Sequence, residues 1–196
     1  ICESATMDVK FTNSWFDIAL EKEAANALIA DGCVLISQHA DSEGAPKACE
    51  EAGVPNVAYN LDTREWGPNT ALISSRINWQ PYFEHIITAT QKGEAITQDF
   101  CGGLEEGVVV TLGFNEAVAA EGTEAKLEEV KKALIAGEVE VFDTDNFTVG
   151  GKKLDSYMAD VDSDANFEKD TEVIENGVFQ ESKHRSAPYF DIDIDG

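Results

Sequence analysis

The stretch Cys33-Val34-Leu35-Ile36-Ser37 is an almost uninterrupted apolar run, and it decides the fold. Such a run is typical of a β-strand that is covered on both faces, as in a parallel sheet. Residues 45–52 then favour a helix that ends at Gly53, and Val57-Ala58-Tyr59 follows as a second strand. Strand, helix and strand in this order predict a right-handed βαβ unit.

The same alternation extends toward the N-terminus. Val9-Lys10-Phe11-Thr12 is predicted to form a strand, and Asp17 is placed to cap a helix that ends at Asp31-Gly32. Apolar residues that recur at helical spacing predict the buried face of this helix, namely Leu20, Ala24, Ala27 and Leu28.

Toward the C-terminus, strands are predicted at residues 71–75 and 107–112, and helices from Pro81 to residue 92 and from Thr123 to Gly137. The chain is therefore predicted to have an α/β fold, in which helices sandwich a parallel sheet.

Residues 140–196 break the pattern with short β-like runs and many acids. They are predicted to form an irregular extension, with a hairpin that turns at Asn176-Gly177.

The charge of the chain restricts its partners. The 196 residues include 38 Asp and Glu but 14 Lys and Arg, a formal net charge of −24, and 43% are hydrophobic. That hydrophobic content can supply a core, whereas the acidic surface repels phosphate backbones and anionic lipid, so we expect no nucleic-acid partner. The chain begins at Ile1, without methionine or a signal peptide, which suggests that preceding sequence was removed.

Neither cysteines nor acids predict a metal site or a cofactor. The four cysteines form no CxxC pair and are expected to be buried as small hydrophobic residues: Cys2, Cys33, Cys49 and Cys101. Alternating acids at 160–164 and 191–195 resemble the opening of a calcium loop but lack its closing acid, so solvated loops are expected. A calcium-stabilised extracellular module remains a third alternative for the function.

Aromatic, amide and carboxylate side chains follow the predicted strands. Because ligands bind beyond the carboxyl ends of parallel strands, we expect these side chains to line a binding site. Aromatic faces would stack on a flat polar ligand while amides and acids bind its rim. The candidate ligand-binding residues are Trp15, Phe16, Asp41, Asn60, Asp62, Asn78 and Trp79.

No catalytic motif is present in the sequence, which lacks a nucleophile elbow, a zinc-protease motif and a P-loop. We therefore predict a binding protein with no catalytic residues. The alternative is a flavodoxin-like enzyme that acts at the same strand ends through His39 and Asp41.

Several motifs, spread over nearly the whole chain, resemble the BMP/PnrA-like family of substrate-binding lipoproteins of ABC importers. The matching segments are residues 11–17, 21–25, 36–42, Tyr59-Asn60-Leu61-Asp62, 78–82, 103–109 and 185–191. The resemblance implies a type I periplasmic-binding fold, in which two α/β lobes close over a purine nucleoside or a related base.

The resemblance also implies that this chain is mainly the second lobe. Residues 1–78 and 101–142 would form that lobe, residues 79–100 would return to the absent first lobe, and residues 143–196 would be the acidic extension. An apolar face with Phe83, Ile86 and Ile87 is then expected to be exposed or self-associated. The full-length protein would be a lipoprotein outside the cytoplasmic membrane, partnered by an ABC permease.

Ribose-binding residues of the family match only in part. Nucleoside-binding members have an acid after the third strand of the second lobe and a lysine after the fourth. Here those places are Asn60, with Asp62 nearby, and Ile77-Asn78. The missing lysine leaves room for a free base or another flat ligand, for which Trp15 and Phe16 are the stacking candidates.

Overall fold

The computed structural model describes residues 4–97, 100–162, 165–180, 183–184 and 192–195. The chain forms two compact units, one of residues 8–131 and one that combines residues 1–7 with residues 132–196. The matching segment at residues 185–191 lies outside the described residues, as do Cys2, Asp164 and Asp191.

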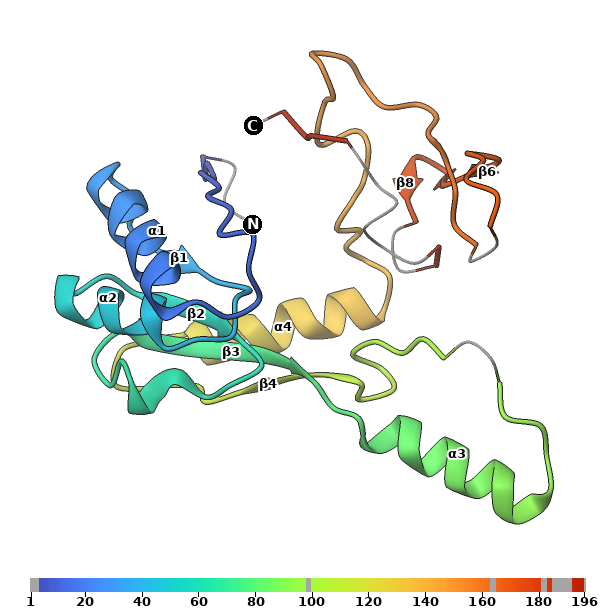
Figure 1. The fold of residues 1–196 in the computed structure, drawn as a ribbon, viewed down its shortest axis with the longest axis horizontal. Helices are drawn as coiled ribbons and strands as arrows, with labels where there is room; N and C mark the ends of the chain where they lie inside the picture. The colour runs from blue at the N-terminus through green and yellow to red at the C-terminus, as the bar shows by residue number, and fades with distance from the viewer. Residues whose placement is uncertain (1–3, 98–99, 163–164, 181–182, 185–191, 196) are drawn as a thin grey trace. The chain divides into compact units, whose positions relative to one another are not determined.

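A four-stranded sheet lies at the centre of the larger unit (Figure 1). Its strands are β1 (Ile36–Ser37), β2 (Asn56–Tyr59), β3 (Ala71–Ile77) and β4 (Val109–Leu112), side by side in that order. The pairs β1–β2 and β2–β3 are parallel, which confirms the predicted α/β fold with a parallel core.

The fourth strand runs antiparallel to β3, and the prediction of a parallel strand here was wrong. After β3 and a helix, the chain returns to the carboxyl end of β3, where the backbone N–H of Asn78 donates to the carbonyl of Val108 (2.7 Å). A strand that begins beside the end of its neighbour can pair only by running back along it.

Two helices cover one face of the sheet. They are α1 (Ile18–Ala30) and α2 (Gly44–Ala52), and their shared core with the sheet contains Ala25, Ile36, Ala45, Ala48 and Cys49. Asp17 caps α1 as predicted, since its carboxylate accepts the N–H groups of Ala19 and Leu20. Gly53 ends α2 with a φ of 69°, a conformation that glycine adopts without strain.

Three predictions about this side of the molecule were wrong. Residues 9–12 form no strand, and Phe11 is exposed, because no neighbour pairs with them. The run at 33–37 narrows to the two-residue edge strand β1, and its Val34 is exposed because only one face is covered. Helix α1 buries Glu21 and Ala25 and leaves Leu20 exposed, so the first turns of its buried face are rotated by about one residue, whereas Leu28 packs against the core as predicted.

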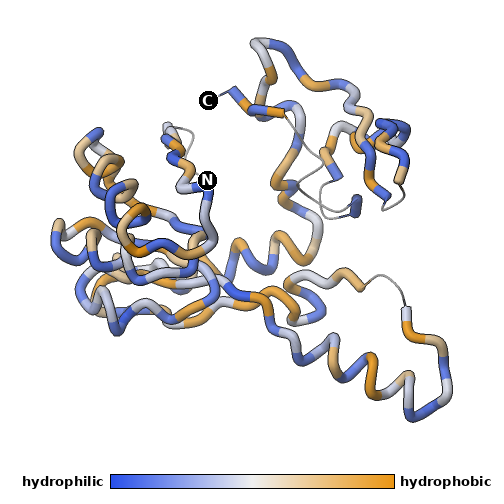
Figure 2. Tube along the Cα trace, viewed as in Figure 1, coloured by the Kyte–Doolittle hydropathy of each residue, from blue (hydrophilic) through white to orange (hydrophobic). Residues whose placement is uncertain are grey.

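The remaining helices are η1 (Thr63–Glu65, a 3-10 turn), α3 (Gln80–Lys92) and α4 (Thr123–Ile135). Hydrophobic positions recur along α3 (Figure 2), yet Ala89 is its only buried residue. Phe83 and Ile87 are each 55% exposed, as expected for this face, and Ile86 is half-buried. No helix within the described ranges is both long and apolar enough to cross a bilayer.

The smaller unit contains short strand pairs, β5 (Met158–Ala159) with β6 (Thr171–Glu172), and β7 (Ile174–Glu175) with β8 (Val178–Phe179). Asn176 and Gly177 both have positive φ, which confirms the predicted hairpin. The core of the smaller unit is formed by Ala159, Val173 and Phe179 with the neighbouring apolar side chains.

Candidate functional site

Three segments converge where β1 and β2 end: residues 13–17 before α1, residues 38–42 after β1, and Tyr59 and Asn60 at the end of β2. We call this group the strand-end cluster. Four of the seven predicted ligand residues belong to these segments, namely Trp15, Phe16, Asp41 and Asn60.

Backbone hydrogen bonds hold the first two segments together. The N–H of Asp41 donates to the carbonyl of Trp15 (2.9 Å). The carboxylate of Glu21 accepts the N–H of Asp17 through Oε1 (2.9 Å) and that of Ser42 through Oε2 (3.1 Å).

The two helices that follow these segments, α1 and α2, pack closely against each other. A Cβ added to Gly44 would lie 2.4 Å from the carbonyl oxygen of Ile18, so the first turn of α2 presses directly on the first turn of α1. Residues 13–17 and 38–42 therefore precede two helices that are tightly packed against each other.

The polar side of the cluster is a paired amide and acid. The side-chain Nδ2 of Asn60 donates to Oδ1 of Asp41 (3.3 Å). Asn60 has a φ of 71°, and its backbone N–H donates to the carbonyl of Ser75 (2.7 Å), so its position is fixed by β3. The second oxygen of Asp41 and the amide oxygen of Asn60 accept no hydrogen bond from any residue that the structure describes, which leaves them available to a ligand.

The aromatic side of the cluster is open to solvent. Trp15 is 83% exposed and Phe16 is 61% exposed. In the other two segments, the rings of His39 and Tyr59 stack, with centroids 5.4 Å apart and planes 28° from parallel. Exposed rings and unused hydrogen-bond acceptors on adjoining segments are a suitable surface for a flat, hydrogen-bond-donating ligand.

Asp62 is engaged within the chain. Arg64 donates through Nε to Oδ1 (2.9 Å) and through Nη2 to Oδ2 (2.6 Å), and these hydrogen bonds lower the pKa of the Asp62 carboxyl. Gly113 lies so close to this carboxylate that an added Cβ would be 2.6 Å from Oδ1. Asp62 thus joins the turn after β2 to the chain that follows β4.

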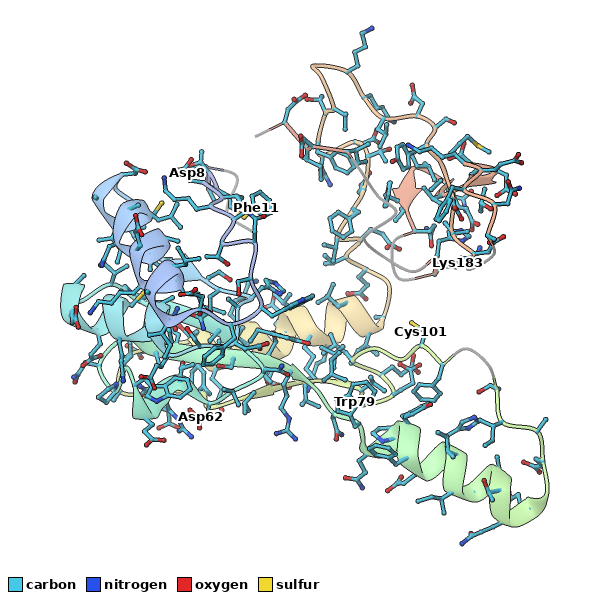
Figure 3. All side chains as sticks on the ribbon, viewed as in Figure 1. Asp8, Phe11, Asp62, Trp79, Cys101 and Lys183 are labelled. Carbon is cyan, nitrogen blue, oxygen red and sulfur yellow. The ribbon has the colours of Figure 1, made fainter. Side chains whose placement is uncertain are left out.

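Asn78 and Trp79 lie at the start of α3 instead. Nδ2 of Asn78 donates to the carbonyl of Gly107 (3.0 Å), and the Trp79 ring meets Tyr82 edge-on at 6.2 Å. Trp79 and Asp62 lie well apart (Figure 3). The structure therefore does not bring Asp62, Asn78 and Trp79 into one group with Trp15.

The geometry does not favour the enzyme alternative. The His39 ring stacks on Tyr59, while Asp41 is held by Asn60. His85 contacts Thr97 (3.0 Å), and His184 lies 3.9 Å from the Glu175 carboxylate in the other unit.

The described residues include no group of three or more His, Cys, Asp or Glu arranged to hold a metal ion. Asp195, an acid of the predicted loops, accepts hydrogen bonds from the Gly151 N–H (2.6 Å) and the Thr148 hydroxyl (2.7 Å), and these bonds lower the pKa of its carboxyl. The prediction for the cysteines holds for Cys49, which is buried; burial raises the pKa of its thiol to about 11. It was wrong for Cys101, which is exposed, and Cys33 is half-buried.

Two residues that shape the cluster, Tyr59 and Glu21, were not among the predicted site residues. Each appeared in the sequence analysis only as part of a predicted strand or of a segment that resembles the family. The signal for Glu21 was its position four residues after the helix cap Asp17, from which its carboxylate can reach back to the N–H of the cap.

Comparison with known proteins gives one family and several relatives. Residues 3–145 match the family Bmp, described as ABC transporter substrate-binding protein PnrA-like. A purine-binding protein of Brucella abortus is 29% identical over 167 residues, which cover 79% of this chain and 48% of that protein. A Haloferax volcanii protein that carries the name of an ABC transporter glucose-binding protein, TsgA13, is 38% identical over 104 residues, which cover 53% of this chain and 27% of that protein.

A solved structure supports the fold. An ABC transporter solute-binding protein from Conexibacter woesei matches with a TM-score of 0.58 at 17% identity, covering 70% of this chain and 46% of that one. The chain thus spans less than half the length of each of these proteins. On the family match over residues 3–145, this chain belongs to the PnrA-like family of ABC transporter substrate-binding proteins.

Proposed function

We propose that the strand-end cluster binds a flat polar ligand, a purine nucleobase, nucleoside or similar molecule, for an ABC importer, and releases it unchanged. The observation that carries this proposal is the backbone hydrogen bond that joins Asp41 to Trp15, which brings a segment with two exposed rings, Trp15 and Phe16, next to the segment of the Asp41–Asn60 pair. Large exposed rings on a rigid polar frame lose little conformational entropy when a ligand covers them.

The chemistry of the cluster selects a ligand that donates hydrogen bonds. Asp41 and Asn60 each offer a side-chain oxygen, and the Asp17 carboxylate is used by the cap of α1. Amino and ring N–H groups of a nucleobase suit this arrangement, and the printed name of the Brucella relative points the same way. A sugar, as in the name of the Haloferax protein, also stacks on aromatic rings, so glucose is the comparison ligand.

Asp62, Asn78 and Trp79 remain proposed as outer contacts. Asp62 and Asn78 already make hydrogen bonds within the chain, so we assign them weaker roles than Asp41 and Asn60.

The chain spans less than half of its relatives, so the whole transport protein is also a matter of proposal. We place the facing wall of the site on a second lobe, which closes on the ligand. The exposed face of α3, with Phe83 and Ile87, would pack on that lobe or self-associate. The full-length protein would be a lipoprotein outside the membrane and would deliver its ligand to a permease.

Calorimetric titration of the 196-residue chain tests the ligand class. We expect saturable binding of adenine or adenosine, weaker than micromolar because one wall of the site is proposed to lie elsewhere, and no comparable binding of glucose. If glucose binds more tightly than adenine and adenosine, the proposed ligand class would be a sugar and not a purine. Turnover of a nucleoside would overturn the binding-protein proposal.

A matched pair of phenylalanine variants tests the place of binding. Phe16 is 61% exposed in the cluster, and Phe83 is 55% exposed on α3. Phe16→Ala is expected to weaken purine binding about tenfold, because loss of a stacking ring removes about 1–1.5 kcal/mol. Phe83→Ala should leave the affinity unchanged, and equal effects of the two variants would contradict the assigned site.

A further inference from the structure

Glu21 is an unusual acid in this molecule. It is 3% exposed, and among the residues that the structure describes it is the only fully buried carboxylate. A buried carboxylate is costly unless hydrogen bonds satisfy its oxygens. Both oxygens of Glu21 are satisfied by backbone N–H groups, one from Asp17 and one from Ser42.

The two donors belong to different segments of the strand-end cluster. Asp17 directly follows the rings Trp15 and Phe16, and Ser42 directly follows Asp41. The hydrogen bond from the N–H of Asp41 to the carbonyl of Trp15 adds a third link between the same segments. The Glu21 carboxylate therefore fixes the spacing between the aromatic side of the site and its acidic side.

We infer that Glu21 is a positioning residue of the binding site, which it shapes without an exposed surface that could touch the ligand. Its two charge-assisted hydrogen bonds hold the aromatic segment 13–17 against the acidic segment 38–42. The ligand part of this inference rests on the proposed function, whereas the positioning of Trp15 and Asp41 is a property of the free protein.

Glu50 offers a matched control. Its carboxylate also accepts a backbone N–H, that of Asn69 (3.0 Å), and the hydroxyl of Thr70 (3.0 Å). These partners lie immediately before β3, at the opposite end of the strands from the cluster. Glu50→Gln therefore removes a comparable carboxylate without touching the segments that carry the site.

The test compares Glu21→Gln with Glu50→Gln in the 196-residue chain. A glutamine keeps the size of the side chain but offers one oxygen, so one of the N–H groups of Asp17 and Ser42 loses its partner. We expect amide hydrogen exchange at that residue and at Asp41 to accelerate about tenfold, and purine affinity to fall by a similar factor. Glu50→Gln should change neither exchange in the cluster nor affinity.

The fluorescence of Trp15 gives a second readout that needs no ligand. In a chain whose other two tryptophans are replaced by phenylalanine, Glu21→Gln should shift the Trp15 emission, and Glu50→Gln should not. If Glu21→Gln folds too poorly, Glu21→Asp keeps both oxygens on a shorter stem and should show the same changes at smaller amplitude.

A loss of stability in Glu21→Gln without any change in Trp15 emission or Asp41 exchange would overturn the inference, because the acid would then serve the core alone. If Glu21→Gln changes the Trp15 emission and the Asp41 exchange but the wild-type chain binds no purine, the positioning role is supported and the proposed function is rejected.

Discussion

Two regions of the larger unit expose large apolar side chains to a similar degree but are built differently. In the strand-end cluster, Trp15 and Phe16 lie on a loop that is hydrogen-bonded to a neighbouring loop and to a buried acid. On α3, Phe83 and Ile87 lie on a regular helix, where the ring of Tyr82 contacts Phe83 and Phe100.

We propose that this difference separates a ligand site from a packing surface. Exposed rings on a segment that adjoins unused acceptors, those of Asp41 and Asn60, would provide both stacking and recognition of the ligand's rim. An apolar helix face that buries little beyond Ala89 provides area without polar recognition, as expected for a surface that another folded part covers. Exposure alone therefore does not assign a function.

The largest expected effect comes from the same truncation made in the two regions. Ile36 in β1 is 3% exposed beneath the cluster, whereas Ile87 on α3 is 55% exposed. Ile36→Ala should lower the free energy of unfolding by about 2–5 kcal/mol, because it leaves a cavity in the core. Ile87→Ala should change it by less than about 0.5 kcal/mol, since an exposed helix position tolerates alanine well. Urea unfolding measures both, and a large loss in Ile87→Ala would show that α3 is more tightly packed than described.

A smaller effect is expected at Asn60, where a substitution should lower ligand affinity but leave the free energy of unfolding almost unchanged. Asn60 has a φ of 71°, which glycine adopts freely, so Asn60→Gly should change the free energy of unfolding by less than about 1 kcal/mol. It removes the partner of Asp41, and purine affinity should fall about tenfold in a calorimetric titration. Asn176→Gly, at a φ of 53°, gives the stability cost of the same replacement in the hairpin. Unchanged affinity in Asn60→Gly would remove Asn60 from the site.

The smallest expected effect is on how the free energy of unfolding depends on pH at acidic pH, and it comes from Asp62. Hydrogen bonds from Arg64 lower the pKa of Asp62, so their stabilisation is present above the unfolded-state pKa of about 4 and is lost as the pH falls through the lower folded-state value. Asp62→Asn should therefore be less sensitive than wild type to acidification below about pH 4. Thermal melts between about pH 5 and 2.5 measure the difference, which should be small because the pair is partly exposed.

Local signals in the sequence predicted much of the fold. The cap at Asp17, the stop at Gly53 and the turn at Asn176-Gly177 are each decided by a residue and its immediate neighbours. The failures depend on partners distant in sequence: residues 9–12 lack a pairing strand, and the direction of β4 follows from where the chain returns.

The sequence predicted several residues of the candidate site, but it did not predict which of the selected residues lie together in the structure. Strand-end reasoning selected Trp15, Asp41 and Asn60, which the structure places together. It also selected Asp62, because nothing in the sequence reveals that Arg64 donates hydrogen bonds to the Asp62 carboxylate. Glu21 was missed because, beside Lys22 and Glu23, it resembles any surface acid until the fold buries it.

The most direct test of the central claim follows the emission of Trp15 as ligand is added. In a chain in which Trp66 and Trp79 are replaced by phenylalanine, Trp15 is the only tryptophan left. We predict a saturable change in its fluorescence on titration with adenine or adenosine, with the midpoint that calorimetry gives for binding. Saturable binding by calorimetry with no change in Trp15 fluorescence would contradict the assignment of the strand-end cluster as the ligand site.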